Sequence, residues 1–211
     1  MEDSGNIGFV LLCAAFVFVM TPGLAMFYGG LVRKKNVVNT MMTSIFIIGV
    51  GIVMWVLFGY SLSFAPSGNA FIGDFRWLGL EGVSLTEGYT DGASIPNMVF
   101  SAFQMMFAVI TPALITGAVA GRMKFKSIFV FTIFWSLIVY YPLAHMVWGQ
   151  GGLLGADGIG ALDFAGGDVV HISSGVSALV LCVLLGKRHD YEHSIYRIHN
   201  IPTVVLGASL L

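Results

Sequence analysis

The segment IGFVLLCAAFVFVMTPGLAMFYGG, residues 7–30, runs for 24 residues without a charged side chain. A helix needs roughly 20 mostly apolar residues to cross the hydrocarbon core of a bilayer. Four further segments meet this criterion, and a last apolar segment of 11 residues is too short to cross. The predicted spans are 7–30, 37–65, 95–121, 128–148 and 162–186, with 201–211 as the start of a sixth. The sequence therefore predicts an all-α membrane protein with five transmembrane helices. We expect the chain to end inside a sixth helix, as a piece of a longer protein would.

The composition also indicates a membrane protein. Of the 211 residues, 57% are hydrophobic and 10% are charged, and the mean hydropathy is +0.88. A soluble domain is nearer a quarter charged, so these few charges cannot cover a water-facing surface. The formal net charge of −1 leaves no basic surface for binding nucleic acid. Cys13 and Cys182 lie in apolar segments, which predicts small buried side chains rather than a disulfide or a metal pair.

The basic residues predict an orientation. Nine of the ten fall in three segments on one side of the predicted spans, namely Arg33, Lys34, Lys35, Arg122, Lys124, Lys126, Lys187, Arg188 and Arg197. Arg76 falls on the other side. Because cytoplasmic loops carry an excess of Lys and Arg, we expect these three segments inside the cell. The N-terminus and the loops 66–94 and 149–161 are then outside.

Aromatic and small residues predict how the spans are arranged. Large aromatic residues lie mainly near predicted span ends, as an interfacial belt would: Trp55, Tyr60, Trp77, Tyr140, Tyr141 and Trp148. Small residues form one side of the first span (Gly23, Ala25, Gly29, Gly30) and of the fifth (Ser173, Ser174, Gly175, Ser177). Since small residues let membrane helices approach closely, we expect tight helix packing on both sides.

Two carboxylates and an imidazole lie within nine residues at the start of the fifth span, in LDFAGGDVVHI (162–172). Ionisable groups at membrane depth are costly and usually face a cavity or a partner. Asp163 lies at the predicted outer mouth. It suits a helix cap, and it also suits stabilisation of a cation arriving from outside; both roles are compatible.

His171 lies eight residues further, roughly 12 Å along a helix. Burial there favours a neutral imidazole that can give and take a proton. Asp168 precedes His171 by three positions, so a salt bridge that keeps the imidazole charged is the other possibility. The residues alone leave both open.

Aromatic residues could bind a cation. Phe103 and Phe107 are four residues apart and share a helix face, where such pairs usually serve packing. Trp148 ends the fourth span and is either an interface anchor or a cation–π partner. A single Asp–His pair without a third group or a metal set does not make a catalytic site, so we expect neither an enzyme nor a cofactor.

Seven motifs occur in order along the chain: FYGGLVRKKN (27–36), FQMMFA (103–108), AHMVWG (144–149), LDFAGG (162–167), VVHI (169–172), GKR (186–188) and HNIP (199–202). Together they resemble the ammonium transporter (Amt/Mep/Rhesus) family over essentially the whole chain. Trp148 makes the chain similar to the microbial and plant branch.

The resemblance implies transport of ammonium or methylammonium, recruited outside as a cation and conducted as ammonia with separate proton handling. It implies an eleven-helix fold of two inverted five-helix halves, of which residues 1–211 match the first. Phe107, Trp148 and Asp163 would recruit the cation, Phe103 and Phe107 would form the outer gate, and His171 with the carbonyls of Ala165 and Gly166 would line the pore. It also implies a homotrimer in the cell membrane, with a PII-type regulator as a possible cytoplasmic partner. The alternative function is an ammonium sensor that controls an attached signalling domain.

The chain departs from the family pattern in two ways. The inner gate, the recruitment serine and the second pore histidine belong to the other half and have no counterpart here, so we expect these 211 residues alone not to form a complete pore. Ammonium-dependent current in liposomes that hold only this chain would contradict that. Asp168 stands where many relatives have an uncharged residue, and its role is left open.

Overall fold

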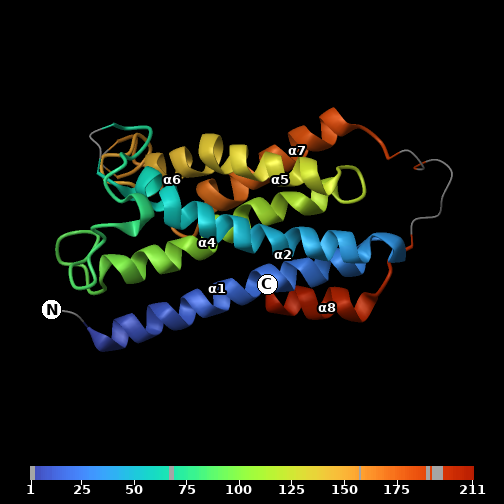
Figure 1. Cartoon of the computed structure of the whole chain (residues 1–211), viewed down its shortest axis with the longest axis horizontal. Helices are drawn as coiled ribbons and strands as arrows, with labels where there is room; N and C mark the ends of the chain where they lie inside the picture. Colours follow the sequence, from blue (N-terminus) through green and yellow to red (C-terminus); the bar gives the residue numbers. More distant parts are fainter. Residues whose placement is uncertain (1–2, 67–68, 157, 189–190, 192–196) are drawn as a thin grey trace.

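The computed structural model describes residues 3–66, 69–156, 158–188, 191 and 197–211, and these residues form helices and loops without a strand. Five helical stretches are long and apolar enough to cross a membrane (Figure 1). They are Ser4–Leu31, Lys34–Phe64, Asn97–Val119, Phe125–Trp148 and Gly167–Leu185, followed by the shorter Ile201–Leu210. The predicted five spans are confirmed. The fifth helix begins five residues later than predicted, because residues 162–166 form a loop.

Several spans are built from more than one element. The first is α1 (Ser4–Leu31) and the third is α4 (Asn97–Val119). The second joins η1 (Lys34–Asn36), α2 (Val37–Met54), η2 (Trp55–Gly59) and α3 (Tyr60–Phe64). The fourth joins α5 (Phe125–Trp135), η4 (Ser136–Tyr140) and α6 (Tyr141–Trp148). The fifth joins η5 (Gly167–Ile172) and α7 (Ser173–Leu185), α8 is Ile201–Leu210, and η3 (Leu78–Leu80) lies in the long loop. Elements η2, η4 and η5 are π-helical turns, a geometry that often marks functional sites.

The connecting segments separate to the two ends of the bundle (Figure 1). The three basic segments gather at one end, where the backbone N–H of Asn200 donates to the carbonyl of Gly30 at 3.1 Å. The two long loops gather at the other end, where Leu153 N–H donates to the Ala70 carbonyl at 2.9 Å. This arrangement agrees with the predicted alternation of the loops.

Glycines bring α8 and α1 into close contact. A methyl group on Gly207 would lie 2.3 Å from the Phe27 backbone nitrogen and 2.7 Å from the Gly23 carbonyl oxygen. A methyl group on Gly30 would lie 2.8 Å from the Val204 backbone nitrogen. The predicted packing face of the first span is therefore used, since only glycine fits where two backbones approach so closely.

The corresponding prediction for the fifth span is only partly right. Ser173 and Ser174 are buried, but a methyl group on Gly175 would meet no atom within 4 Å. The exposed face of α7 includes Val176, Leu179 and Val183. The helix packs against α4, and its Ser177 hydroxyl also accepts a hydrogen bond from Trp135 Nε1 of α5 at 2.8 Å.

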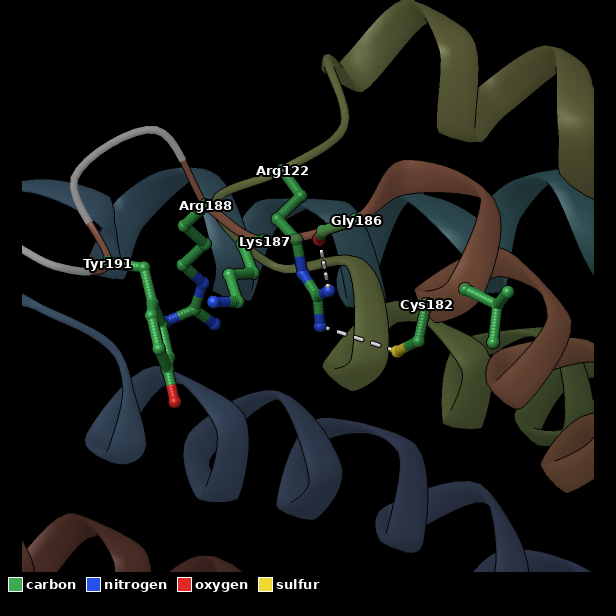
Figure 2. Close-up of a pocket in the computed structure, with 7 residues that line it drawn as sticks. Arg122, Cys182, Gly186, Lys187, Arg188 and Tyr191 are labelled. Atoms are coloured by element: carbon green, nitrogen blue, oxygen red, sulfur yellow. Dashed lines mark hydrogen bonds between the residues drawn. The ribbon is translucent and has the colours of Figure 1, made fainter.

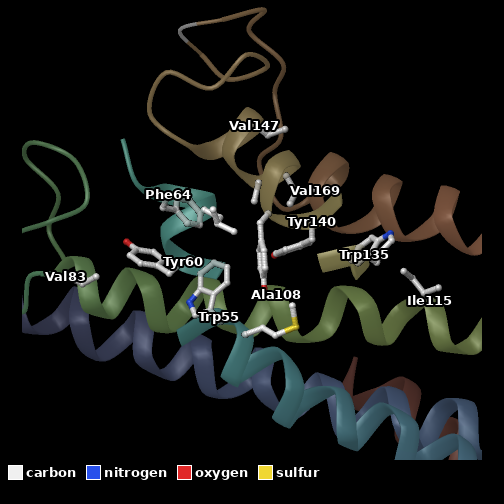
Figure 3. Packing of buried hydrophobic residues seen from close by; sticks show 14 residues of the cluster. Trp55, Tyr60, Phe64, Val83, Ala108, Ile115, Trp135, Tyr140, Val147 and Val169 are labelled. Carbon is white, nitrogen blue, oxygen red and sulfur yellow. The ribbon is translucent and has the colours of Figure 1, made fainter. Parts of the chain in front are cut away.

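The aromatic residues assigned to an interfacial belt mostly form a core instead. Trp55, Tyr60, Tyr140 and Tyr141 are each at most 1% exposed and contact one another inside the bundle (Figure 3). Two of them have hydrogen-bond partners there: Trp55 Nε1 donates to the Ser101 carbonyl at 3.2 Å, and the Tyr60 hydroxyl donates to Asn97 Oδ1. The belt prediction is wrong for these four, because nearness to a span end does not say whether a side chain points into the bundle.

Arg122 joins the basic ends of α4 and α7 (Figure 2). Its Nη1 donates to the Gly186 carbonyl at 3.0 Å, and its Nη2 donates to the Ala118 carbonyl at 2.7 Å and to Cys182 Sγ at 3.3 Å. Arg122, Lys187 and Arg188 line a cavity of about 450 Å³ beside this contact. Cys13 and Cys182 are free, as predicted, but both are half-buried rather than buried.

Candidate functional site

A pocket of about 550 Å³ opens at the end of the bundle opposite the basic segments. One wall is a stripe of α4 formed by Phe100, Phe103, Gln104 and Phe107. The other walls are Tyr89, Trp148 and residues 163–166. The structure therefore brings together Phe103, Phe107, Trp148, Asp163, Ala165 and Gly166, the predicted recruitment, gate and carbonyl residues. His171 is not among the lining residues.

The α4 wall follows from helix geometry. Positions 100, 103, 104 and 107 have the i, i+3, i+4, i+7 spacing that places side chains on one face. The rings of Phe103 and Phe107 meet edge to face, with centroids 5.0 Å apart. The ring of Phe100 stacks on the ring of Tyr89, which lies in the loop 66–94, with the two centroids 4.9 Å apart. The prediction that Phe103 and Phe107 share a face is confirmed, and that face lines a pocket.

Trp148 is the last residue of α6 and is half-buried. Its Nε1 faces the backbone carbonyl of Asp163 at 3.4 Å, a long hydrogen bond. The indole is thereby turned toward the segment that precedes η5. Its aromatic face is the best cation–π partner that a protein side chain offers, worth about 0.5–2 kcal/mol.

The Asp163 carboxylate caps the start of the fifth helix. Oδ1 accepts backbone N–H groups from Gly166 at 2.6 Å and Gly167 at 2.7 Å, and Oδ2 accepts from Asp168 at 2.9 Å and Val169 at 3.0 Å. Gly166 makes this possible, since its φ of 83° turns the chain back beneath the carboxylate. The first turn of a helix leaves its N–H groups without partners, and one side chain here satisfies four. The capping interpretation is confirmed.

His171 lies in the π-helical turn η5 and is exposed. Its backbone N–H reaches back five residues to the Gly166 carbonyl at 3.0 Å, which also accepts from Val170 at 3.0 Å. Among the described residues no hydrogen bond or ion pair joins His171 to Asp168, so the salt-bridge alternative is not formed. The wider turn of a π-helix rotates residues three apart away from each other.

Two polar residues were missed by sequence reasoning. His145 is fully buried one turn before Trp148, with Nδ1 3.1 Å from the Ser63 carbonyl and Nε2 2.8 Å from the Asn69 carbonyl. Both partners are backbone carbonyl oxygens, which accept hydrogen bonds. Gln104 lies between Phe103 and Phe107 in the sequence and lines the pocket with them. The signal that could have found each of them was a single polar residue on a helix face whose other residues are apolar.

The loop 66–94 carries two groups with shifted pKa values, Asp74 and Tyr89. A side-chain hydrogen bond from Arg76, at 2.8 Å, holds the pKa of Asp74 below its usual value. Burial raises the pKa of Tyr89 to about 12, so the pocket wall that Tyr89 forms stays neutral at physiological pH. Within the residues that the structure describes, no group of three or more His, Cys, Asp or Glu side chains is arranged to hold a metal ion.

Five membrane-length helices and an aromatic pocket beside a capped carboxylate define a multi-pass helical membrane protein with a recess suited to a small cation. The model of the Ammonium Transporter Family matches residues 8–211. The chain belongs to the ammonium transporter family, as its motifs indicated.

Named relatives agree. The chain is 51% identical over 208 residues to an ammonium transporter of Bacillus subtilis, covering 98% of this chain and 50% of the relative. It is 39% identical to the ammonium transporter Amt1 of Archaeoglobus fulgidus, covering 100% and 50%. Among solved structures, Mep2 of Saccharomyces cerevisiae superposes with a TM-score of 0.86 at 36% identity, covering 100% of this chain and 47% of that one. The chain spans about half the length of the curated relatives it matches.

Proposed function

We propose that the protein moves ammonium across a membrane and that the aromatic pocket recruits the cation from outside. The observation that carries this proposal is the convergence of Phe107, Trp148 and Asp163 on one pocket at the end opposite the basic segments. Aromatic faces attract a small cation without removing all of its water. The Asp163 charge adds a favourable field, although its oxygens are engaged by the backbone.

A passage for neutral ammonia follows from the cost of desolvation. Moving a bare small ion into a medium of low dielectric constant costs on the order of 20 kcal/mol on an idealised Born estimate. We therefore expect ammonium to leave its proton before the apolar passage, with Phe103 and Phe107 as the gate. Ala165 and Gly166 line the same pocket as the aromatic rings, and His171 lies in η5, which follows them; we expect the three to line the passage.

Transport is better supported than sensing. The curated relatives at 39–51% identity cited above are named ammonium transporters. A solved structure titled as a sensor Amt protein has the same fold with a TM-score of 0.82, but it is 27% identical. The sensor alternative therefore has the weaker support.

The remaining features of the proposal concern the assembly. We expect residues 1–211 to form the N-terminal half of the transport domain, in a homotrimer in the cell membrane with its N-terminus outside. Methylammonium is expected as a second substrate. A PII-type protein on the side of the basic segments is the expected regulator.

Methylammonium uptake by cells that lack their own ammonium transport tests the proposal. The protein expressed is the complete transport domain, in which residues 1–211 form the first half, because these residues alone are not expected to form a pore. Trp148→Leu removes one cation–π contact of about 0.5–2 kcal/mol, so the KM should rise about 2- to 30-fold. Phe134→Leu is the matched control, because Phe134 is 58% exposed on the fourth span and lies outside the pocket. Unchanged uptake by Trp148→Leu would reject the recruitment role, and no uptake by the unaltered protein would reject transport.

A further inference from the structure

An ammonium ion needs hydrogen-bond acceptors as well as aromatic faces. Each of its N–H bonds donates, and a π-face replaces lost water only in part. The pocket is lined mainly by rings, so the oxygen atoms in its walls supply the acceptors: backbone carbonyls of residues 163–166 and a few side chains. Three lining side chains carry such oxygens: Tyr89, Gln104 and Asp163.

Two of these three are already engaged. A carboxylate offers about four lone-pair sites, and Asp163 accepts four backbone N–H groups. The Tyr89 hydroxyl accepts the backbone N–H of Gln150 at 3.1 Å. Direct coordination of the cation by Asp163 would therefore break the cap that begins the fifth helix.

Gln104 differs from both. Its Oε1 is buried and, within the described residues, has no hydrogen-bond partner. Buried polar atoms in folded proteins almost always have a partner, and an unpaired one is costly. Gln104 also lies on the same stripe of α4 as Phe103 and Phe107 and lines the same pocket, so a turn of its amide about the side-chain torsions brings Oε1 to a cation held by the rings.

We propose that Gln104 is a specificity-determining residue of the recruitment pocket, whose side-chain oxygen accepts a hydrogen bond from an N–H of the bound ammonium or alkylammonium ion. This inference rests on the proposed function. The bound cation supplies the donor that the apo pocket lacks, while the aromatic rings hold the positive charge. This contact selects ligands that carry an N–H group. A cation–π site alone makes no such selection.

The test compares Gln104→Met with Gln104→Glu. Methionine keeps the length of the side chain and removes the acceptor, whereas glutamate keeps an acceptor at the same reach. For Gln104→Met we expect the KM for methylammonium to rise about tenfold with little change in the maximal rate, because one hydrogen bond from a charged donor is lost. Gln104→Glu is expected to keep a KM no higher than that of the unaltered protein.

Thermal unfolding in detergent separates this role from a structural one. Since Oε1 has no partner in the fold, Gln104→Met should be at least as stable as the unaltered protein. A lowered unfolding temperature would mean that Gln104 serves the fold instead, and a methylammonium KM unchanged by Gln104→Met would also overturn the proposal. If Trp148→Leu is impaired while Gln104→Met is normal, only this inference fails. If the unaltered protein does not take up methylammonium, the proposed function fails with it.

Discussion

Asp163 is a structural residue as well as a source of negative charge. Its two oxygens accept the N–H groups of residues 166–169, which would otherwise begin the fifth helix without partners. An acid so placed stays at a fixed position relative to Trp148, whose Nε1 faces the same residue's carbonyl. The local geometry explains how one charged residue is held at the mouth of an apolar bundle.

Replacing Asp163 with Asn should therefore destabilise the protein. The amide has one acceptor oxygen and points an NH₂ group at backbone donors, so we expect a loss of about 1–3 kcal/mol. Thermal unfolding in detergent measures this. Asp168→Asn is the matched control on the same segment, because the described structure gives the Asp168 side chain no hydrogen bond. Equal losses for the two variants would contradict the capping role.

Which site residues could be predicted from sequence depends on whether their partners are local. The cap of Asp163 joins residues within six positions, so an acid before an apolar run was enough to predict it. His145 contacts carbonyls at positions 63 and 69, and no local pattern announces contacts across more than 70 residues. Gln104 was overlooked for the same reason, since its pocket is completed by Trp148 and Asp163.

The lengths of the apolar segments were enough to predict the five spans. Whether an aromatic residue near a span end is buried depends instead on the direction of its side chain, which these lengths do not give. Trp55 begins the π-helical turn η2, Tyr141 follows the π-helical turn η4, and both side chains are buried in the core. A π turn shifts the helix face by an amount that a regular period of 3.6 does not anticipate. The late start of the fifth helix has a different cause, the left-handed backbone of Gly166.

The contact between α1 and α8 depends on glycine. Gly207→Ala would place a methyl group 2.3 Å from the Phe27 backbone nitrogen, so the helices must separate. We expect a loss of about 1–3 kcal/mol, as for other overpacked sites, measured as a lower unfolding temperature. Gly49→Ala on α2 is the control, since its methyl group would meet no atom within 4 Å. Similar unfolding temperatures for both variants would contradict close packing here.

The whole molecule has two unlike ends. The basic segments lie at one end, and the loops 66–94 and 149–161 lie at the other (Figure 1). The aromatic pocket is lined by residues from that second end. By the positive-inside rule we expect the pocket to face outward.

Cysteine labelling tests this orientation. In a protein whose own cysteines are replaced by alanine, Thr86→Cys and Lys126→Cys place exposed thiols at opposite ends. A membrane-impermeant maleimide added to intact cells should label Thr86→Cys, and it should label Lys126→Cys only after the membrane is opened. The reverse pattern would place the pocket inside.

The central claim is that the cation binds beside Trp148. Protein labelled with 5-fluorotryptophan and titrated with methylammonium tests it by fluorine NMR, with the Trp148 resonance assigned by its loss in Trp148→Phe and sodium chloride as the control for ionic strength. We predict a saturable shift of that resonance, while the buried Trp55 and Trp135 resonances stay in place. A Trp148 resonance that does not move at methylammonium concentrations that saturate uptake would contradict the account.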